Sequence, residues 1–259
     1  MSIDTDPNPP LVSVVMSVFN AGSEVSAAIE SIVRQSHKPW EFIIVDDGST
    51  DLTRGVIQRY VTKYPQIKLL INDSNCGLAY SLNKAIRHAS GQYIARMDAD
   101  DIAFSDRLEA QVNYLEMHSE ISVLGTGAEV ISSGRKSVIF KPEEHSRILK
   151  GIEKFNPFFH SSVMMRRDFF DRMKGYDAKL LRAQDYDLWL RGVDKFQYHN
   201  LQKVLMIYTS RNQSFQSIYY GLRVRFVNAY RRHRIVSGLS KAVLVFLYAI
   251  WVKIVSFFK

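Results

Sequence analysis

Short β-rich runs alternate with helical patterns through the first hundred residues, and this alternation restricts the chain to few folds. Buried-strand patterns occupy residues 11–18, 42–45, 67–71 and 93–97. Between them, apolar residues recur at helical spacing over residues 25–33, 56–61 and 78–89. Strands that alternate with helices of about a dozen residues form βαβ units, with parallel strands and helices on both faces. The sequence therefore predicts an α/β fold built on a mainly parallel sheet.

The second half of the chain carries a weaker pattern. An amphipathic helix is expected after Ser105, followed by short strand-like pieces between Ser122 and Phe140 and a mixed, loop-rich stretch over 156–192. Neither an internal repeat nor a low-complexity linker is present, so the sequence gives no ground for two separate domains. We expect an N-terminal extension (1–10), a main domain (11–214) and a tail (215–259).

Charge is distributed very unevenly along the chain. The net charge is +8, yet the last acidic residue is Asp194, and eleven cations follow it with no anion. Residues 1–194 therefore hold 23 cations against 26 acids. Such asymmetry indicates an acidic partner surface for the tail, either nucleic acid or anionic lipid.

Composition removes several other classes of protein. A chain with 46% hydrophobic and 23% charged residues is neither disordered nor fibrous. The single cysteine, Cys76, excludes an internal disulfide and suits a reducing compartment. The first ten residues carry Asp4, Asp6 and three prolines before any apolar run, so we expect no signal peptide. No uninterrupted apolar stretch reaches the roughly 18 residues of a membrane span.

Two acidic clusters follow predicted strands, where doubly wound sheets bind their ligands. Asp46 and Asp47 begin an Asp-Asp-Gly-Ser run, which could equally be a turn or a helix cap. Asp98, Asp100 and Asp101 are harder to explain in that way, because three carboxylates within four residues repel one another unless a cation compensates. Mg²⁺ and similar cations take carboxylates together with phosphate oxygens. The two clusters together predict a metal-bound nucleotide.

The two common phosphate-binding loops are missing. The sequence has no GxxxxGK[ST] motif and no GxGxxG after the first strand, which argues against a P-loop NTPase and a dinucleotide-binding enzyme. Five other motifs occur in order over residues 11–192. These motifs are SVVMSVFNA, FIIVDDGSTD, NCGLAYSLNKAI, GQYIARMDADD and GYDAKLLRAQDYDLWLR. They resemble those of a family 2 glycosyltransferase with the Rossmann-like GT-A fold, from the branch that builds bacterial polysaccharide and O-antigen repeat units.

The resemblance implies a GT-A catalytic domain over 11–214 and roles for both acidic clusters. In such enzymes the first pair of acids, here Asp46 and Asp47, binds the uracil or ribose of a sugar nucleotide. The DxD element, here Asp98 and Asp100, holds a divalent metal (Mn or Mg) and the diphosphate. Asp101 is then a supporting neighbour.

The resemblance also implies the position of the catalytic base. The family usually has Glu-Asp before Tyr-Asp-Leu-Trp, whereas this chain has Gln184 and Asp185. We expect Asp185 to accept the proton of an acceptor hydroxyl as that hydroxyl attacks the anomeric carbon with inversion. Asp185 also fits a helix N-cap, and the two roles are compatible.

Three further side chains are weaker candidates. Arg96 precedes the DxD element and is expected to support the diphosphate, although an ion pair with Asp98 would serve equally well. His160 matches a family position usually written His-Pro-Ser, and is assigned with Trp189 to the acceptor pocket. A purely structural histidine explains His160 as well.

The tail and the resemblance together predict where the protein acts. The apolar segment 242–258 would be roughly 25 Å long as a helix, shorter than a bilayer core of about 30 Å. We therefore expect a helix lying on the membrane; a true span, or a helix packed on the catalytic domain or a dimer partner, are the alternatives. The predicted location is the cytoplasmic face of the inner (plasma) membrane, bound peripherally to an anionic surface.

Three functions compete at this point. The first is a metal-dependent, inverting hexosyltransferase that moves galactose or glucose from a UDP-sugar to a polyprenyl-diphosphate-linked GlcNAc or GalNAc. A β1,3 linkage in O-antigen or capsule repeat units is favoured by analogy alone. The second is a non-catalytic GT-A-fold binding or regulatory protein, which the Gln184 substitution leaves open. The third, a nucleic-acid binder, leaves the acidic clusters without a role, so no nucleic-acid partner is expected.

Overall fold

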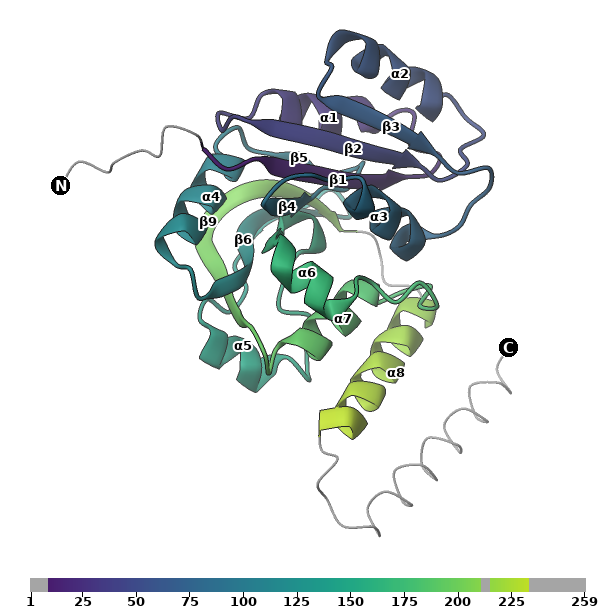
Figure 1. Ribbon diagram of the computed structural model, residues 1–259. Helices are drawn as coiled ribbons and strands as arrows, with labels where there is room; N and C mark the ends of the chain where they lie inside the picture. Colours follow the sequence, from purple (N-terminus) through teal and green to yellow (C-terminus); the bar gives the residue numbers. More distant parts are fainter. Residues whose placement is uncertain (1–8, 211–214, 233–259) are drawn as a thin grey trace, which may run out of the picture.

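The strands at the centre of the sheet are apolar along almost their whole length because helices cover both of their faces. In the computed structural model, which describes residues 9–210 and 215–232, β1 (Val12–Val18) and β2 (Trp40–Asp46) are buried almost throughout. Alternate side chains enter two separate cores: Val14 and Phe42 pack on one side of the sheet, Val15 and Ile43 on the other. The first core also holds α1 (Val25–Val33), α2 (Thr53–Lys63) and α4 (Arg107–Met117). The second holds α3 (Leu78–Arg87), α5 (His145–Gly151), α6 (Arg167–Met173) and α7 (Gln184–Gly192), as the layers in Figure 1 show.

The predicted βαβ units are confirmed in the first half of the chain. All four predicted strands form, and each predicted helix lies where the apolar periodicity indicated. The elements after β1 and β2 are α1 (Val25–Val33), α2 (Thr53–Lys63), β3 (Ile67–Ile71), α3 (Leu78–Arg87), β4 (Tyr93–Arg96), β5 (Ile102–Ala103), α4 (Arg107–Met117), β6 (Ile121–Ser132), β7 (Arg135–Ile139), α5 (His145–Gly151), a 3-10 turn (His160–Ser162), β8 (Met164–Arg166), α6 (Arg167–Met173), α7 (Gln184–Gly192), β9 (Gln197–Ser210) and α8 (Phe215–Arg232).

Within the described residues the strands form one nine-stranded sheet in the order β3-β2-β1-β4-β8-β6-β9-β5, with β7 paired to β6. The β3-β2-β1-β4 half is parallel throughout. Parallel strands align their carboxyl ends at one edge, so the residues that follow β1, β2 and β4 are brought together there.

The second half of the sheet contains both parallel and antiparallel pairs. β8 runs antiparallel to both β4 and β6, while β6 and β9 are parallel and β5 is antiparallel to β9. A parallel neighbour requires a long crossover, usually a helix, whereas β8 follows a 3-10 turn and enters the sheet from the opposite direction. The sequence pattern in this half of the chain does not encode the direction of its strands.

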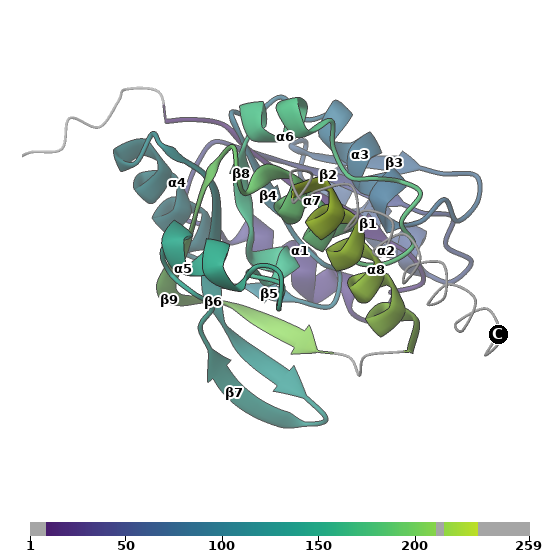
Figure 2. The same ribbon diagram turned by 90° about the horizontal axis from the view of Figure 1, so that it is seen from below.

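β6 and β7 form a hairpin that projects from the body of the molecule in Figure 2. Its two turn residues, Ser133 and Gly134, both have positive φ, of 49° and 75°. Two such residues in succession are typical of the turn whose twist matches that of the flanking strands. β7 is exposed along its whole length.

α8 packs beside α7 rather than leaving the domain, as both views show (Figures 1 and 2). Val224 is buried in the second core, and Asn228 Nδ2 donates to Asp187 Oδ1 of α7 at 3.2 Å. The predicted tail therefore begins with a helix held against α7 and the second core. The apolar segment 242–258 lies outside the described residues. No helix in the described part of the chain is long and apolar enough to cross a membrane.

Candidate active site

A cavity of about 980 Å³ opens at the carboxyl ends of β1 and β4. Ser17 and Val18 of β1 contribute to it, as do residues that follow β4, the loop before α7, and α8. Ligand sites usually measure about 300–1,000 Å³, so this cavity is at the upper end of the range. Of the side chains assigned from sequence, it brings together Arg96, Asp98, Asp100, His160 and Asp185.

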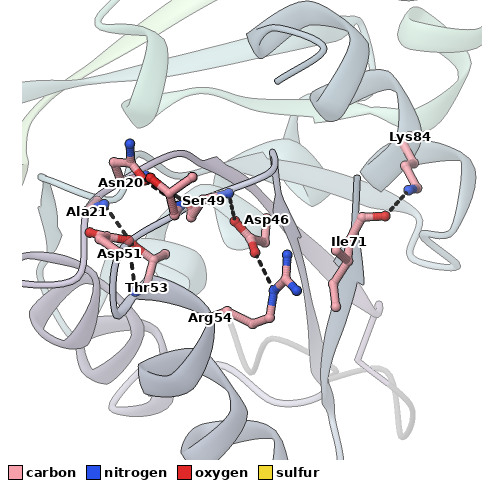
Figure 3. Close-up of polar contacts among 10 residues, drawn as sticks. Asn20, Ala21, Asp46, Ser49, Asp51, Thr53, Arg54, Ile71 and Lys84 are labelled. Atoms are coloured by element: carbon pink, nitrogen blue, oxygen red, sulfur yellow. Dashed lines mark hydrogen bonds and ion pairs between the residues drawn. The ribbon is translucent and has the colours of Figure 1, made fainter. Parts of the chain in front are cut away.

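The loop after β2 is tied to the loop after β1 by polar contacts (Figure 3). Asp46 is fully buried; its carboxylate accepts hydrogen bonds from the Ser49 backbone N–H at 3.0 Å and from Arg54 Nε at 2.9 Å. Ser49 Oγ in turn accepts from the Asn20 backbone N–H at 3.0 Å. These contacts fix the chain where it leaves β1 and β2.

Asp47 organises the start of α3. Its carboxylate accepts from the backbone N–H groups of Cys76 and Gly77, both at 2.9 Å, and from Asn72 Nδ2 and Ser81 Oγ at 2.7 and 2.9 Å. A carboxylate at a helix N-terminus satisfies unpaired backbone donors and favours the helix dipole. Neither Asp46 nor Asp47 lines the cavity, so their direct contact with a nucleotide base or ribose stays a prediction.

The acidic cluster after β4 divides into two parts. Asp98, Asp100 and Asp101 each offer a carboxylate oxygen, and these oxygens lie within 4.8 Å of one another. Asp101 is buried; it accepts a hydrogen bond from Ser161 Oγ and one from the Thr209 backbone N–H at 2.7 Å. Burial, and next the charge of Asp98, raises the pKa of Asp101 to about 7. Asp98 and Asp100 are half-buried and line the cavity.

These two carboxylates fit a divalent cation. Carboxylate oxygens are the ligands that Mg²⁺ and Mn²⁺ prefer, and two of them facing a cavity leave further positions for phosphate oxygens. Arg96, which is fully buried, forms an ion pair with Asp98. An ion pair with Asp98 was the alternative to a diphosphate contact that we considered for Arg96. The pair holds the Asp98 carboxylate in place at the cavity wall.

Asp185 lies in the first turn of α7 and lines the same cavity as Asp98 and Asp100. Its strongest polar contact is with Asn156, whose Nδ2 donates to Asp185 Oδ2 at 2.6 Å. Burial raises the pKa of Asp185 above that of an ordinary aspartate, while the Asn156 hydrogen bond opposes the rise by stabilising the carboxylate. A carboxylate with a raised pKa at a cavity wall is suited to accepting a proton.

Replacing Asn156 by alanine should move the acid limb of the pH–activity profile to higher pH. The Asn156 hydrogen bond favours the charged carboxylate, so its loss raises the pKa of Asp185 further. A general base is active when deprotonated, so if Asp185 has that role the variant should lose activity at a pH where the wild type is still active. Asn113→Ala, an exposed change on α4, is the control and should leave the profile unchanged. An unshifted acid limb in Asn156→Ala would show that this contact does not tune the pKa of Asp185.

Sequence reasoning missed several side chains at the cavity. Lys141 is half-buried, and its Nζ donates to the Asn156 carbonyl oxygen at 3.3 Å and lies 4.8 Å from the centre of the Phe159 ring. Asn156 stands at the head of the NPFFHSSVMMRR run and could have been noticed there. Lys141 lies in a stretch without any motif, so nothing in the sequence around it indicates a place at the cavity.

The two residues assigned to the acceptor pocket differ in position. His160 lines the cavity, and its Nε2 is 2.9 Å from the Tyr176 hydroxyl oxygen. Burial, and then the charge of Arg96, holds the pKa of His160 well below its usual value, so the ring is neutral. Trp189 is fully buried, packs against Phe158 and Phe169, and does not line the cavity. The assignment of Trp189 to acceptor binding is therefore withdrawn, because the apolar face of α7 turns it into the core.

Comparison with known proteins gives the class of the chain. Residues 13–174 match the family model for glycosyl transferase family 2. EpsE of Bacillus subtilis, which is named as a glycosyltransferase, is 38% identical over 244 residues, covering 92% of this chain and 81% of EpsE. WfgD of Escherichia coli, a UDP-Glc:alpha-D-GlcNAc-diphosphoundecaprenol beta-1,3-glucosyltransferase, is 31% identical over 185 residues, covering 70% of this chain and 68% of WfgD.

The fold agrees with the family. A fragment of TarS from S. aureus, solved in complex with UDP, superposes with a TM-score of 0.69 at 21% identity. The match covers 85% of this chain and 65% of the TarS fragment, just under two thirds of its length. The chain belongs to glycosyl transferase family 2 and has the GT-A fold.

Proposed function

We propose that this protein is an inverting, metal-dependent glycosyltransferase that moves a hexose from a UDP-sugar to a sugar linked to polyprenyl diphosphate. The observation that carries the proposal is the placement of Asp98, Asp100 and Asp185 on one cavity at the carboxyl edge of the parallel strands. The cavity thus combines a candidate cation site with a candidate base. Family membership supports the reaction class.

The donor is proposed to bind across the ends of β1 and β4. Asp98 and Asp100 would hold a divalent cation, Mn²⁺ or Mg²⁺, which when bound offsets the negative charge on the departing diphosphate. Arg96 keeps Asp98 oriented through their ion pair and adds positive charge beside the phosphates. Asp46 and Asp47 hold the loops that border the nucleotide.

Asp185 is proposed to be the catalytic base. It accepts the proton from a hydroxyl of the acceptor sugar, and that oxygen forms a bond to the anomeric carbon of the donor. The bond between the anomeric carbon and the diphosphate oxygen breaks on the opposite side, so the configuration inverts. Asn156 fixes the carboxylate for this step through its 2.6 Å hydrogen bond.

The substrates follow from the relatives by analogy. WfgD is named for glucose transfer from UDP-Glc to a GlcNAc-diphosphoundecaprenol with a β1,3 linkage. We extend from this to a glucose or galactose donor, a GlcNAc or GalNAc acceptor and a β1,3 bond in O-antigen or capsule repeat units. Release of UDP should be acceptor- and metal-dependent for one member of a UDP-sugar panel. UDP release that depends on neither acceptor nor metal, or no UDP release with any donor, would contradict the proposal.

The protein is proposed to act at the cytoplasmic face of the inner membrane, bound peripherally. Support comes from the eleven cations and absent acids after Asp194, and from the lipid-linked acceptor. The full-length chain should sediment with vesicles that contain anionic lipid and be released by high salt, because surface charges are screened. Full recovery in the supernatant at low salt would reject membrane attachment.

A further inference from the structure

The cavity has a second cationic region beside the candidate base, apart from the Asp98 and Asp100 cluster. Arg182 precedes α7 by two residues, and Arg225 of α8 contacts Tyr186, the residue next to Asp185; both arginines line the cavity. The donor diphosphate is proposed to bind at the cluster of Asp98 and Asp100. Two guanidinium groups on the side of the base therefore match a second phosphate-bearing ligand.

Arg225 is held in a fixed position at the cavity wall. Its Nε donates to the Tyr186 hydroxyl oxygen at 3.2 Å, and its guanidinium lies 5.5 Å from the centre of the Tyr186 ring. Arginine has five N–H donors, so this contact leaves others for an anion. α8 contains no acidic residue to compete for them. A pre-positioned guanidinium loses little freedom on binding phosphate.

The face of α8 that carries Arg225 also exposes apolar side chains to the cavity. Ile218, Gly221, Leu222 and Arg225 all line it, and their spacing of three, four and seven residues places them on one face of the helix. Ile218 and Leu222 are 48% and 45% exposed, although both are large and apolar. A Cβ added to Gly221 would meet nothing within 4 Å, so the face is open between them.

We propose that this face of α8 (Ile218, Gly221, Leu222 and Arg225), with Arg182, binds the diphosphate and the first isoprenyl units of the acceptor. This inference rests on the proposed function, which supplies the acceptor class. The two arginines contact the diphosphate, and Ile218 and Leu222 contact the adjoining hydrocarbon. The sugar then lies toward Asp185, which is flanked by both arginine-bearing elements.

Direct binding of farnesyl diphosphate to the full-length chain tests the proposal without turnover. Isothermal titration calorimetry in the presence of saturating UDP should detect binding, because the nucleotide and prenyl sites are separate. Arg225→Gln and Arg182→Gln should each weaken it roughly ten- to a hundredfold, the loss expected for a charge-assisted hydrogen bond. Arg223→Gln is the matched control on the same helix, since Arg223 does not line the cavity, and it should bind as the wild type does.

The apolar part is tested with the double variant Ile218→Ser, Leu222→Ser. Both side chains are well exposed, so this variant should fold, as a thermal melt would verify. It should weaken farnesyl diphosphate about tenfold or more and leave the binding of inorganic diphosphate unchanged. Leu149→Ser, an exposed leucine on α5, is its control. Wild-type affinity in both arginine variants, or full displacement of farnesyl diphosphate by UDP, would overturn the inference.

Kinetics separate this inference from the proposed function. With a lipid-diphosphate-linked acceptor, the arginine variants should raise the acceptor KM and leave the donor KM unchanged. Sugar transfer that none of these variants alters would reject the α8 site and keep the reaction. Arg225-dependent prenyl diphosphate binding in a protein that transfers no sugar would reject the reaction and keep the site.

Discussion

Asp185→Asn should lower kcat by about two to four orders of magnitude, the contribution usual for a general base. Asparagine has nearly the shape of aspartate but cannot take up the acceptor proton. Asp185 lines the cavity and its strongest hydrogen bond is with Asn156, so the change removes chemistry with little disturbance of the wall. The measurement is initial-rate kinetics of sugar transfer with a lipid-diphosphate-linked acceptor.

Affinity for UDP should be unchanged in Asp185→Asn, because the nucleotide is proposed to bind at the ends of β1 and β4. Asp171→Asn, an exposed change on α6, is the matched control and should retain full activity. A kcat within tenfold of the wild type would show that Asp185 is not the base. A function that does not depend on Asp185 would favour the hypothesis of a non-catalytic binding or regulatory protein.

Removal of divalent metal should abolish transfer, and Asp100→Asn should reduce it at least about a hundredfold. A cation on the leaving diphosphate is worth several kcal/mol of charge stabilisation, and Asp100 offers one of the two carboxylates of the acidic cluster that line the cavity. Treatment with a chelator followed by titration with Mn²⁺ or Mg²⁺ measures the dependence. Activity should return with added metal in the wild type.

Asp106→Asn is the control for the metal experiment. Asp106 belongs to the segment that follows the cluster, but its carboxylate pairs with Lys203 at the surface, 2.6 Å away. Surface pairs contribute little to stability, so the variant should keep both activity and metal requirement. Full transfer in the presence of chelator, or wild-type activity in Asp100→Asn, would contradict the assigned cation site.

The parallel half of the sheet could be predicted because its strands are buried on both faces. A mostly apolar, valine-rich run such as residues 11–18 favours a strand covered by helices on each side. The direction of β8 and β9 could not be predicted, because it depends on connections through loop-rich sequence. In the same half of the sheet, the pairing of β6 with β7 depends on the positive φ angles of Ser133 and Gly134, which close the hairpin.

The candidate site was predictable where it rests on motifs and hidden where it rests on packing. Asp98, Asp100 and Asp185 stand in recognisable motifs, and the fold brings all three to one cavity. Trp189 belongs to the same motif as Asp185, yet the periodicity of α7 directs its side chain into the core. Arg225 was part of a basic tail in the sequence; its place at the cavity depends on the packing of α8 against α7.

The stereochemistry of the transferred sugar tests the central claim most directly. Wild-type protein, Mn²⁺ or Mg²⁺, an α-linked UDP-hexose and a polyprenyl-diphosphate-linked GlcNAc or GalNAc should yield an acceptor extended by one hexose. The anomeric configuration of that hexose, read by NMR, should be β, because a single in-line attack assisted by Asp185 inverts the donor. An α-linked product, or no product with any donor of the panel, would contradict the account.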